Sequence, residues 1–319
     1  MLRVQTLSVT YISKKDKVPA LRGVSFSIAR GEVLGLVGES GCGKSTVALS
    51  ILRLIDEHQA HISGSIEWNG VNILSLKEKE LRRLRGGEIG FVFQDPFTSL
   101  NPVLRLGEHV MEAIAVHQPD LSTEEIKSRA LQLLAQVRLN DPQRIYNSYP
   151  HQVSGGQRQR VMIAIAIANR PTLLIADEPT TALDTTIQKE IMELLLTLKT
   201  ELNMAVLFVT HHLALLSNYA DKILVLYGGE MMEYGNVKEV IAAPRHPYTK
   251  CLIDAIPGRN NVARGERLFS IEGAPPNPKQ LPSGCIFHPR CPSVKQKCRE
   301  AAPEITNNET AQVKCFFPN

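Results

Sequence analysis

The chain has 319 residues, a formal charge of +4, 43% hydrophobic residues and 21% charged residues, which is ordinary composition for a globular protein with a sizeable core. Aromatic residues make up only 5%, which argues against a surface that stacks single-stranded nucleic acid, and the longest apolar run, Val161–Ala168, is much too short for a membrane helix. Polar residues interrupt the apolar pattern after Met1, so we expect no secretion signal and a soluble, cytosolic protein.

Up to about residue 250, short apolar runs alternate with helical patterns, which is typical of an α/β fold. Residues 2–10 and 61–69 alternate apolar and polar side chains, and we expect them to form a small antiparallel sheet at the flank of the core. Buried strands are predicted at five further runs: 33–37, 89–93, 173–176, 206–209 and 223–227.

A glycine-rich segment follows the strand expected at 33–37 and precedes an apolar helix. Its sequence, Gly38-Glu-Ser-Gly-Cys-Gly-Lys-Ser45, fits the phosphate-loop pattern G-x-x-x-x-G-K-[ST] in the strand–loop–helix context that the pattern requires. Glycines let the backbone curl so that its N–H groups face phosphate oxygens, and we expect Lys44 to reach the β- and γ-phosphates and Ser45 to ligate Mg²⁺. The predicted nucleotide-binding residues of this segment are Gly38, Ser40, Gly41, Cys42, Gly43, Lys44, Ser45 and Thr46.

Cys42 is an unusual thiol inside this segment. The loop N–H groups, the helix dipole and the neighbouring Lys44 favour a thiolate, so we expect alkylation to inactivate the protein and MgATP to slow the alkylation. The alternative is that Cys42 is a small residue that fills a tight loop.

The pattern becomes helical between Asp95 and Pro150. Ser122 and Glu125 form a capping box, and apolar residues follow it at helical spacing, namely Ile126, Ala130, Leu133, Leu134 and Val137. These residues predict a helical insertion in the α/β core, over about residues 95–159.

The apolar run at 173–176 ends in two carboxylates, Asp177 and Glu178. Downstream of a phosphate loop, an acidic strand end supplies a magnesium ligand and a base. We therefore assign Asp177 to the magnesium shell and Glu178 to polarising the attacking water.

Val153-Ser-Gly-Gly-Gln157 lies between these two motifs. With the three motifs in this order, the chain resembles the nucleotide-binding subunit of an ABC transporter over about residues 1–250. The resemblance implies a P-loop NTPase core of the ABC ATPase type, with an antiparallel β flank and a helical subdomain. It also implies roles for further residues. Tyr11 stacks on adenine, and Gln94 is the Q-loop glutamine that ligates Mg²⁺ and acts in catalysis. Asp184 lies in the D-loop, His211 is the catalytic switch histidine, and the signature motif consists of Ser154, Gly155, Gly156 and Gln157. The sequence departs from the family pattern at Val153, where Leu is usual, and at His212, where most relatives have an acidic residue.

Subunits that resemble this chain dimerise head to tail, so that each ATP lies between the phosphate loop of one subunit and the signature motif of the other. ATP then joins the two subunits, and hydrolysis releases them.

Three segments resemble the dipeptide, oligopeptide and nickel importer subfamily: Gln94–Pro102, His246–Thr249 and Gly284–Pro292. This resemblance implies an ATPase that energises import of dipeptides or oligopeptides, peripheral on the cytoplasmic face of a bacterial inner membrane. Nickel chelates, antimicrobial peptides and oligosaccharides remain open as cargo. The implied partners are a second ATPase subunit, with a heterodimer favoured over a homodimer, two permease subunits and an extracytoplasmic solute-binding protein.

The alternative is a soluble ABC ATPase that acts on nucleic acid or ribosomes. Members that repair DNA carry long insertions between phosphate loop and signature, whereas here the helical insertion alone accounts for that interval. Ribosome-acting members usually join two cassettes, and this chain has one. We therefore expect no nucleic-acid partner.

The segment from residue 251 to 319 differs from the rest, because it is rich in proline and holds four of the six cysteines, Cys285, Cys291, Cys298 and Cys315. Their wide spacing lacks the tight pairs of structural zinc sites, and Cys291-Pro292 is similar to the C-P step of ferredoxin motifs. Several subfamily members that this chain resembles carry a four-iron cluster on such a tail, so the resemblance implies that these cysteines ligate a [4Fe–4S] cluster of structural role. Zinc and free thiols are the alternatives, and His288 is the less suitable substitute ligand.

Overall fold

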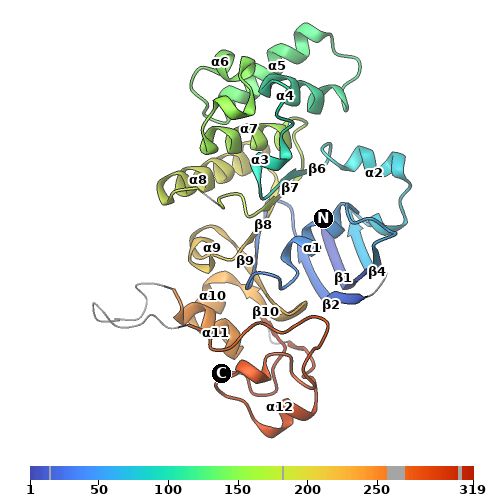
Figure 1. Ribbon diagram of the computed structural model, residues 1–319, viewed down its shortest axis with the longest axis vertical. Helices are drawn as coiled ribbons and strands as arrows, with labels where there is room; N and C mark the ends of the chain where they lie inside the picture. Colours follow the sequence, from blue (N-terminus) through green and yellow to red (C-terminus); the bar gives the residue numbers. More distant parts are fainter. Residues whose placement is uncertain (14–15, 182, 257–269, 308–310) are drawn as a thin grey trace. The chain divides into compact units, whose positions relative to one another are not determined.

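The computed structural model describes residues 1–13, 16–181, 183–256, 270–307 and 311–319. The chain divides into two compact units (Figure 1), of which the first contains Met1–Ser75 and Val209–Asn319 and the second contains Leu76–Phe208. Parts of the C-terminal segment expected at 251–319, namely 257–269 and 308–310, lie outside the described residues. No helix in the described ranges is both long and apolar enough to cross a membrane.

The first unit carries the antiparallel sheet expected from the N-terminal alternation, in the order β2-β1-β4-β5. Its strands are β1 (Leu2–Ile12), β2 (Lys17–Ile28), β4 (Ala60–Trp68) and β5 (Val71–Asn72), of which β2 and β5 had no predicted counterpart. The alternation of β1 breaks at Gln5–Thr6, where the register with both neighbouring strands shifts. Thr6 takes a φ of 47° there, and this bulge returns Leu7 to the buried face.

A second set of strands in the first unit contains the strand that leads to the phosphate loop. β3 (Val33–Val37) pairs in parallel with β9 (Lys222–Tyr227), with Val37 opposite Val225, and all five residues of β3 are buried. β10 (Glu230–Asn236) pairs antiparallel with β9, β12 (Ala311–Val313) with β10, and β11 (Thr306–Asn307) with β12. The helices of this unit are α1 (Lys44–Ile51), α9 (Leu213–Tyr219), α10 (Val237–Ala242), α11 (Pro247–Asp254) and α12 (Gln296–Glu300).

The second unit contains the parallel strands β6 (Ile89–Val92) and β7 (Leu173–Asp177), paired with Val92 opposite Ala176. Because parallel strands end at the same edge of a sheet, this pairing brings the chain after β6 close to the carboxylates that end β7. β8 (Ala205–Thr210) begins in this unit. The chain thus combines parallel and antiparallel strands with helices, in agreement with the expected α/β class.

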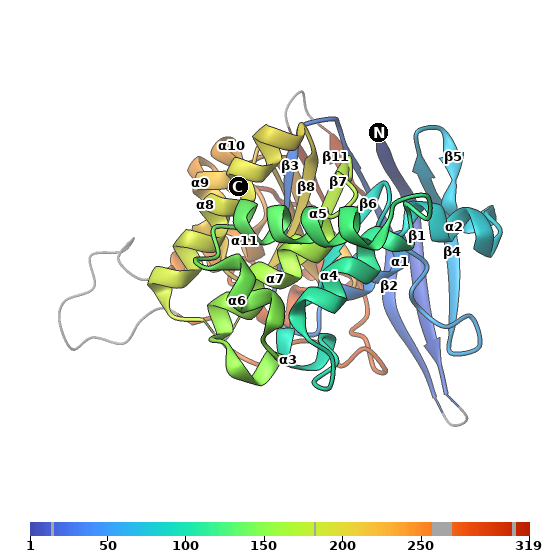
Figure 2. The same cartoon turned by 90° about the horizontal axis from the view of Figure 1, so that it is seen from above.

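The helices of the second unit are α2 (Glu78–Leu84), α3 (Pro96–Ser99), α4 (Leu106–Ala115), α5 (Thr123–Gln136), α6 (Pro142–Asn147), α7 (Gly155–Ile167) and α8 (Thr185–Leu202). Of these, α4, α5, α6 and α7 pack on one another (Figure 2). The capping box read from the sequence starts α5, because Ser122 Oγ accepts a hydrogen bond from the Glu125 N–H at 3.3 Å.

The described part of the C-terminal segment belongs to the first unit and has an apolar anchor. Phe287 is fully buried, and its ring centroid lies 5.2 Å from those of both Tyr227 and Tyr248, which are also buried. Aromatic pairs at such distances add stabilisation beyond their buried area. The described part of this segment therefore packs on a small aromatic core, which can help to order it beside the structural cluster that we expect from the sequence.

Candidate active site

The phosphate loop links β3 to α1 in the first unit, as predicted, and requires glycine at two positions. Gly41 has a φ of 78° and Gly43 a φ of 106°, both in the left-handed region that side chains disfavour. A Cβ on Gly43 would also lie 2.7 Å from the carbonyl oxygen of Ala20. Helix α1 begins directly after Gly43, so the curled loop and the first turn of the helix present N–H groups to an anion together.

Lys44 lies within the curl of the loop. Its Nζ donates hydrogen bonds to the carbonyl oxygen of Gly38 at 2.8 Å and of Glu39 at 3.1 Å, and the residue is 5% exposed. Ser45 is the second residue of α1, and the hydroxyl of Tyr11 lies 3.4 Å from Thr46 Oγ1. The predicted adenine-stacking residue therefore adjoins the predicted phosphate loop.

The two carboxylates that end β7 lie in the second unit, where one of them meets the predicted glutamine. Asp177 is buried, and Glu178 has a φ of 46°, a strained conformation for a non-glycine residue that costs on the order of 1–3 kcal/mol. Gln94 Nε2 donates a hydrogen bond to Glu178 Oε2 at 3.0 Å, and Thr181 Oγ1 donates to the same oxygen at 2.9 Å. These contacts orient the Glu178 carboxylate. Sequence reasoning did not single out Thr181.

The predicted signature motif forms the start of α7. Ser154 is the N-cap residue, its Oγ accepts a hydrogen bond from the Gln157 N–H at 3.3 Å, and Gln157 Oε1 accepts one from the Ser154 N–H at 3.1 Å. Gly155 and Gly156 are the first residues of the helix. The motif therefore holds small residues and backbone N–H groups at a helix N-terminus, an arrangement that favours anions.

Asp184 and His211 both lie at junctions that precede helices. Asp184 is the N-cap residue of α8, and its Oδ1 accepts a hydrogen bond from the Ile187 N–H at 2.9 Å. His211 follows β8 directly, and its ring centroid lies 4.1 Å from that of His212, the N-cap residue of α9. The first unit thus holds Tyr11, the phosphate loop and His211, and the second unit holds Gln94, the two carboxylates, the signature motif and Asp184.

Two family models match the chain. The model described as "ABC transporter" matches residues 21–181, and the model described as "Oligopeptide/dipeptide transporter, C-terminal region" matches residues 232–298. The first match covers half of the chain. The chain belongs to the ABC transporter family. Membership makes it an ATPase subunit of the ABC type, with ATP and Mg²⁺ as its expected cofactors.

Curated relatives match this ABC protein over its whole length. The dipeptide transport ATP-binding protein DppD of Escherichia coli is 46% identical over 319 residues, which cover 100% of this chain and 97% of the relative. DppD of Haemophilus influenzae is 44% identical over 320 residues, with 100% and 96% covered, and the oligopeptide transport ATP-binding protein OppD of Escherichia coli is 45% identical over 318 residues, with 100% and 93% covered.

Solved structures support the same fold. The cassette MJ0796, in a dimeric post-hydrolysis state bound to ADP and Pi, aligns with a TM-score of 0.67 at 34% identity and covers 74% of this chain and 99% of that one. The protein cbiO1 of Clostridium perfringens aligns with a TM-score of 0.64 at 32% identity, with 76% and 90% covered. Both likenesses support the ABC cassette fold for this chain.

The expectation of a reactive thiolate at Cys42 in this ABC protein is wrong. Burial raises the pKa of the thiol to about 11 and outweighs the opposing effect of Lys44, and the residue is 5% exposed. A Cβ on Gly38 would lie 2.7 Å from Cys42 Sγ, so the thiol fills the space beside that glycine. The alternative reading, a small residue in a tight loop, describes Cys42.

We therefore expect iodoacetamide to modify Cys42 slowly at pH 8, whether or not MgATP is present. With a pKa of about 11, roughly one thiol in a thousand is ionised at that pH. Peptide mapping by mass spectrometry measures the rate of modification at Cys42 with and without MgATP. Fast labelling of Cys42 that MgATP suppresses would contradict the burial found here.

The four tail cysteines of this ABC protein line one small pocket. Its volume is about 20 Å³, and it is also lined by buried residues that include His246 and Phe287. Burial raises the pKa of Cys291 to about 11 and also raises those of Cys285 and Cys315. In the part of the chain that the structure describes, no group of three or more His, Cys, Asp or Glu side chains is placed to hold a metal ion. The pocket has room for about one water molecule, so these thiols as placed do not fit the predicted [4Fe–4S] cluster.

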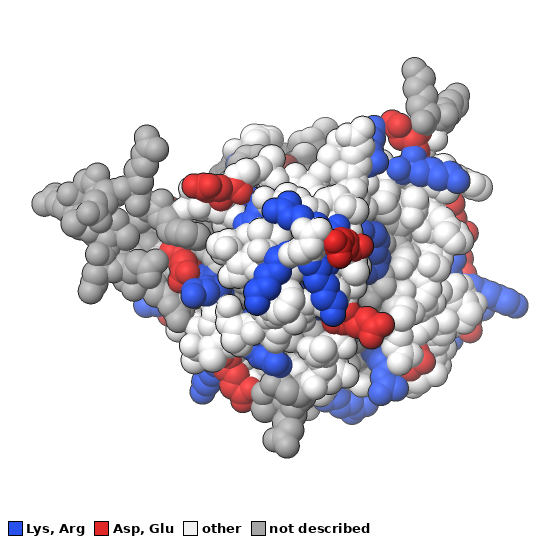
Figure 3. Space-filling model, turned by 90° about the horizontal axis from the view of Figure 1, so that it is seen from below, with Lys and Arg blue, Asp and Glu red and all other residues white. Residues whose placement is uncertain are grey.

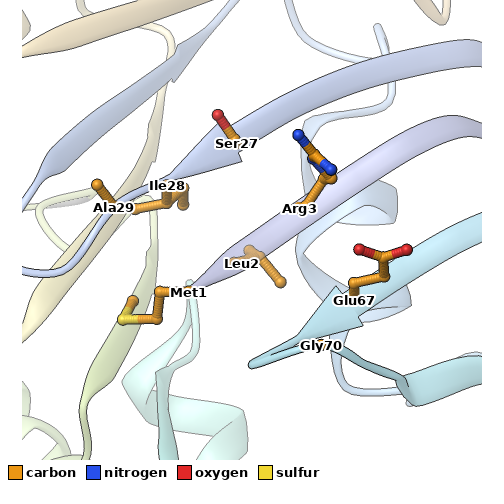
Figure 4. A pocket seen from close by; sticks show the side chains of 8 residues that line it. All are labelled: Met1, Leu2, Arg3, Ser27, Ile28, Ala29, Glu67 and Gly70. Carbon is orange, nitrogen blue, oxygen red and sulfur yellow. The ribbon is translucent and has the colours of Figure 1, made fainter.

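A larger hollow, of about 330 Å³, lies at one end of the antiparallel sheet (Figure 4). Arg3 and Glu67 stand at paired positions of β1 and β4 and line it together with Met1, Leu2, Ser27, Ile28, Ala29 and Gly70. None of the predicted site residues lines this hollow, and we assign it no role.

Proposed function

We propose that this chain is the ATP-hydrolysing subunit of a bacterial ABC importer that takes up dipeptides or oligopeptides. The observation that carries the proposal is the match to DppD and OppD over the full chain, together with the C-terminal-region model at residues 232–298. The cassette alone would support only an ABC ATPase, whereas the full-length match and the C-terminal-region model favour a peptide transporter. Its place is then the cytoplasmic face of the inner membrane, as a peripheral subunit.

Nucleotide binding is assigned to the phosphate loop and its neighbours in the first unit. Lys44 would exchange its hydrogen bonds to Gly38 and Glu39 for bonds to the β- and γ-phosphates, while the loop N–H groups bind the remaining oxygens. Tyr11 would stack on the adenine. Ser45, Gln94 and Asp177 would hold Mg²⁺, since hydroxyl, amide and carboxylate oxygens are the donors this ion prefers. The amide nitrogen of Gln94 donates a hydrogen bond to Glu178, so the amide oxygen of Gln94 is the atom that can ligate Mg²⁺.

Catalysis is assigned to Glu178, Gln94 and His211. Glu178 would polarise the attacking water, and its hydrogen bonds from Gln94 and Thr181 would orient the carboxylate for this task. When bound, Mg²⁺ supplies positive charge that neutralises the transferred phosphoryl group. His211, directly after β8, would donate a hydrogen bond to the γ-phosphate.

The signature motif is assigned to the nucleotide of a second ATPase subunit. Ser154 and the N–H groups of Gly155 and Gly156 at the start of α7 are suited to a γ-phosphate, and Asp184 would lie in the contact between subunits. We propose a heterodimer of two ATPase subunits, which works with two permeases and an extracytoplasmic binding protein.

The test is reconstitution. The chain should co-purify with two permeases and a second ATPase subunit from membranes, and a binding protein loaded with a dipeptide or oligopeptide should stimulate ATP hydrolysis by the complex. Lys44→Ala provides the negative control, because it removes the cation that binds phosphate. Co-purification with nucleic acid or ribosomes, with no membrane subunits, would overturn the proposal.

The [4Fe–4S] cluster stays a prediction. In its favour, all four tail cysteines line one pocket, and against it, they are not placed to hold a metal ion. Iron analysis of anaerobically purified protein decides the matter, since about four irons per chain would require the thiols to rearrange around the cluster. If the protein contains no iron, the prediction of a cluster is wrong and the four cysteines are free thiols.

A further inference from the structure

Glu39, the second residue of the phosphate loop, is held by the C-terminal segment. Both oxygens of its carboxylate accept hydrogen bonds from Arg290, from Nη1 at 2.6 Å and from Nη2 at 3.0 Å. The backbone N–H of Glu39 donates to the hydroxyl of Tyr248 at 3.1 Å. The loop is thus fixed through a side chain and through its backbone, by residues more than two hundred positions away in sequence.

The Arg290 side chain is buried and fully engaged in this contact. Its side chain is 5% exposed, whereas Lys295, Lys297 and Arg299 in the same segment are exposed. Figure 3 shows Lys and Arg side chains on the surface viewed from below, interspersed with Asp and Glu. Arg290 turns inward, where Nε donates to the carbonyl oxygen of Glu272 at 2.9 Å and Nη1 lies 3.3 Å from the Tyr227 hydroxyl. The hydrogen bonds to Glu39 raise the pKa of the guanidinium, so its charge is permanent.

Arg290 lies next to a packed aromatic cluster. Arg290 ends the short 3-10 helix His288–Arg290, which directly follows Phe287. Phe287 packs on Tyr227 and Tyr248, whose ring centroids lie 4.6 Å apart. The residue that holds the Glu39 carboxylate and the residue that holds its N–H group are therefore parts of one packed cluster.

The charge of Glu39 matters because it lies in an anion-binding loop. A carboxylate without a counter-ion in this position would repel phosphate groups, and a bidentate guanidinium offsets its charge at close range. The carbonyl oxygen of Glu39 also accepts a hydrogen bond from Lys44 Nζ. Glu39 is thus fixed between the phosphate-binding lysine on one side and the C-terminal segment on the other.

We propose that Arg290 is a positioning residue for ATP binding, which offsets the charge of Glu39 and holds the phosphate loop in its binding conformation. The C-terminal segment therefore takes part in nucleotide binding although it contributes no residue to the phosphate loop. This inference rests on the proposed binding of ATP by the loop.

The test compares two variants of the full-length chain that have lost the same side chain. Arg290→Ala leaves the Glu39 carboxylate without its counter-ion, and we expect it to weaken MgATP binding about tenfold or more. Arg290→Ala combined with Glu39→Gln lacks the same contacts to Tyr227 and Glu272 but carries no charge at position 39. We expect the double variant to recover most of the lost affinity. Displacement of a fluorescent ATP analogue by MgATP measures both.

Salt provides a second readout that a purely structural role would not move. Repulsion between Glu39 and the phosphates is screened by ions, so the ratio of the Arg290→Ala and wild-type dissociation constants should shrink between about 50 mM and 500 mM KCl. Lys279→Ala is the matched control, because Lys279 joins the C-terminal segment to Asp16 by an ion pair of 2.6 Å away from the phosphate loop. It should bind MgATP as the wild type does.

Wild-type affinity in Arg290→Ala, or equal loss in the single and double variants at all salt concentrations, would overturn the inference. If both variants fail to fold, Arg290→Lys replaces them. A lysine keeps the charge but loses the bidentate geometry, so it should weaken MgATP binding severalfold, and unchanged affinity would overturn the inference. Failure of the proposed function looks different, because wild type and Lys44→Ala would then bind MgATP equally poorly.

Discussion

Glu178→Gln should nearly abolish ATP turnover and leave nucleotide binding intact. We expect hydrolysis by the reconstituted complex to fall by about 10²–10⁴-fold, because glutamine cannot accept the proton of the attacking water. Gln is nearly isosteric with Glu and adopts the strained φ of 46° at about the same energetic cost, so the local fold should persist. Steady-state hydrolysis and equilibrium binding of MgATP measure the two effects separately.

The control for this variant is Glu193→Gln on the exposed face of α8, where the Glu193 side chain forms a long ion pair with Lys189 at 3.9 Å. It should hydrolyse ATP at the wild-type rate. If Glu178→Gln hydrolysed ATP at close to the wild-type rate, Glu178 would not be the catalytic base. Loss of binding in that variant would point instead to a structural role for its contacts with Gln94 and Thr181.

Gly38→Ala should destabilise the protein and distort the start of the phosphate loop. A Cβ on Gly38 would lie 2.1 Å from the carbonyl oxygen of Leu226 in the neighbouring strand β9, and that backbone cannot give way without disturbing its pairing with β3. We expect the free energy of unfolding to fall by about 2–3 kcal/mol, with loss of MgATP binding, since overpacking at a rigid position costs this much. Urea denaturation gives the change in stability.

Gly41→Ala isolates the part of this effect that comes from backbone conformation. Gly41 has a φ of 78°, and a Cβ there would meet no atom within 4 Å, so the cost is only that of a left-handed alanine, about 1–2 kcal/mol. Gly38→Ala should therefore be the more destabilising of the two. If Gly41→Ala were the more destabilising variant, the contact with the Leu226 carbonyl oxygen would not be the main cost of a side chain at position 38.

The phosphate loop and the acidic strand end could be predicted because each is encoded locally. An apolar strand, a glycine-rich turn and a lysine follow one another between Val33 and Lys44, and the strand that ends at Asp177 is equally continuous. The hydrogen bond between Gln94 and Glu178 joins residues 84 positions apart, yet the parallel pairing of β6 and β7 makes their proximity expected.

What the sequence did not reveal depends on burial and on long-range contacts. The pKa of Cys42 was predicted in the wrong direction, because the helix dipole and Lys44 are visible in the sequence and burial is not. The ion pair between Glu39 and Arg290 joins residues 251 positions apart, and no local sequence pattern predicts it. The order of the C-terminal segment likewise follows from the contacts of Phe287 with two tyrosines, which are separated from it by tens of residues.

The pairing of β12 with β10 should protect the protein against self-association. β10 carries the buried Met231 and Met232 and pairs with β9 along one side, so without β12 its other side would offer unpaired N–H and C=O groups beside apolar side chains. Such an edge is a template for strands of other molecules. β12 covers residues Glu233 to Gly235, and the strand outside it, β11, has only two residues, which is too short to template much further pairing. A chain that terminates before residue 306 would therefore expose an aggregation-prone edge even if its cassette folded normally.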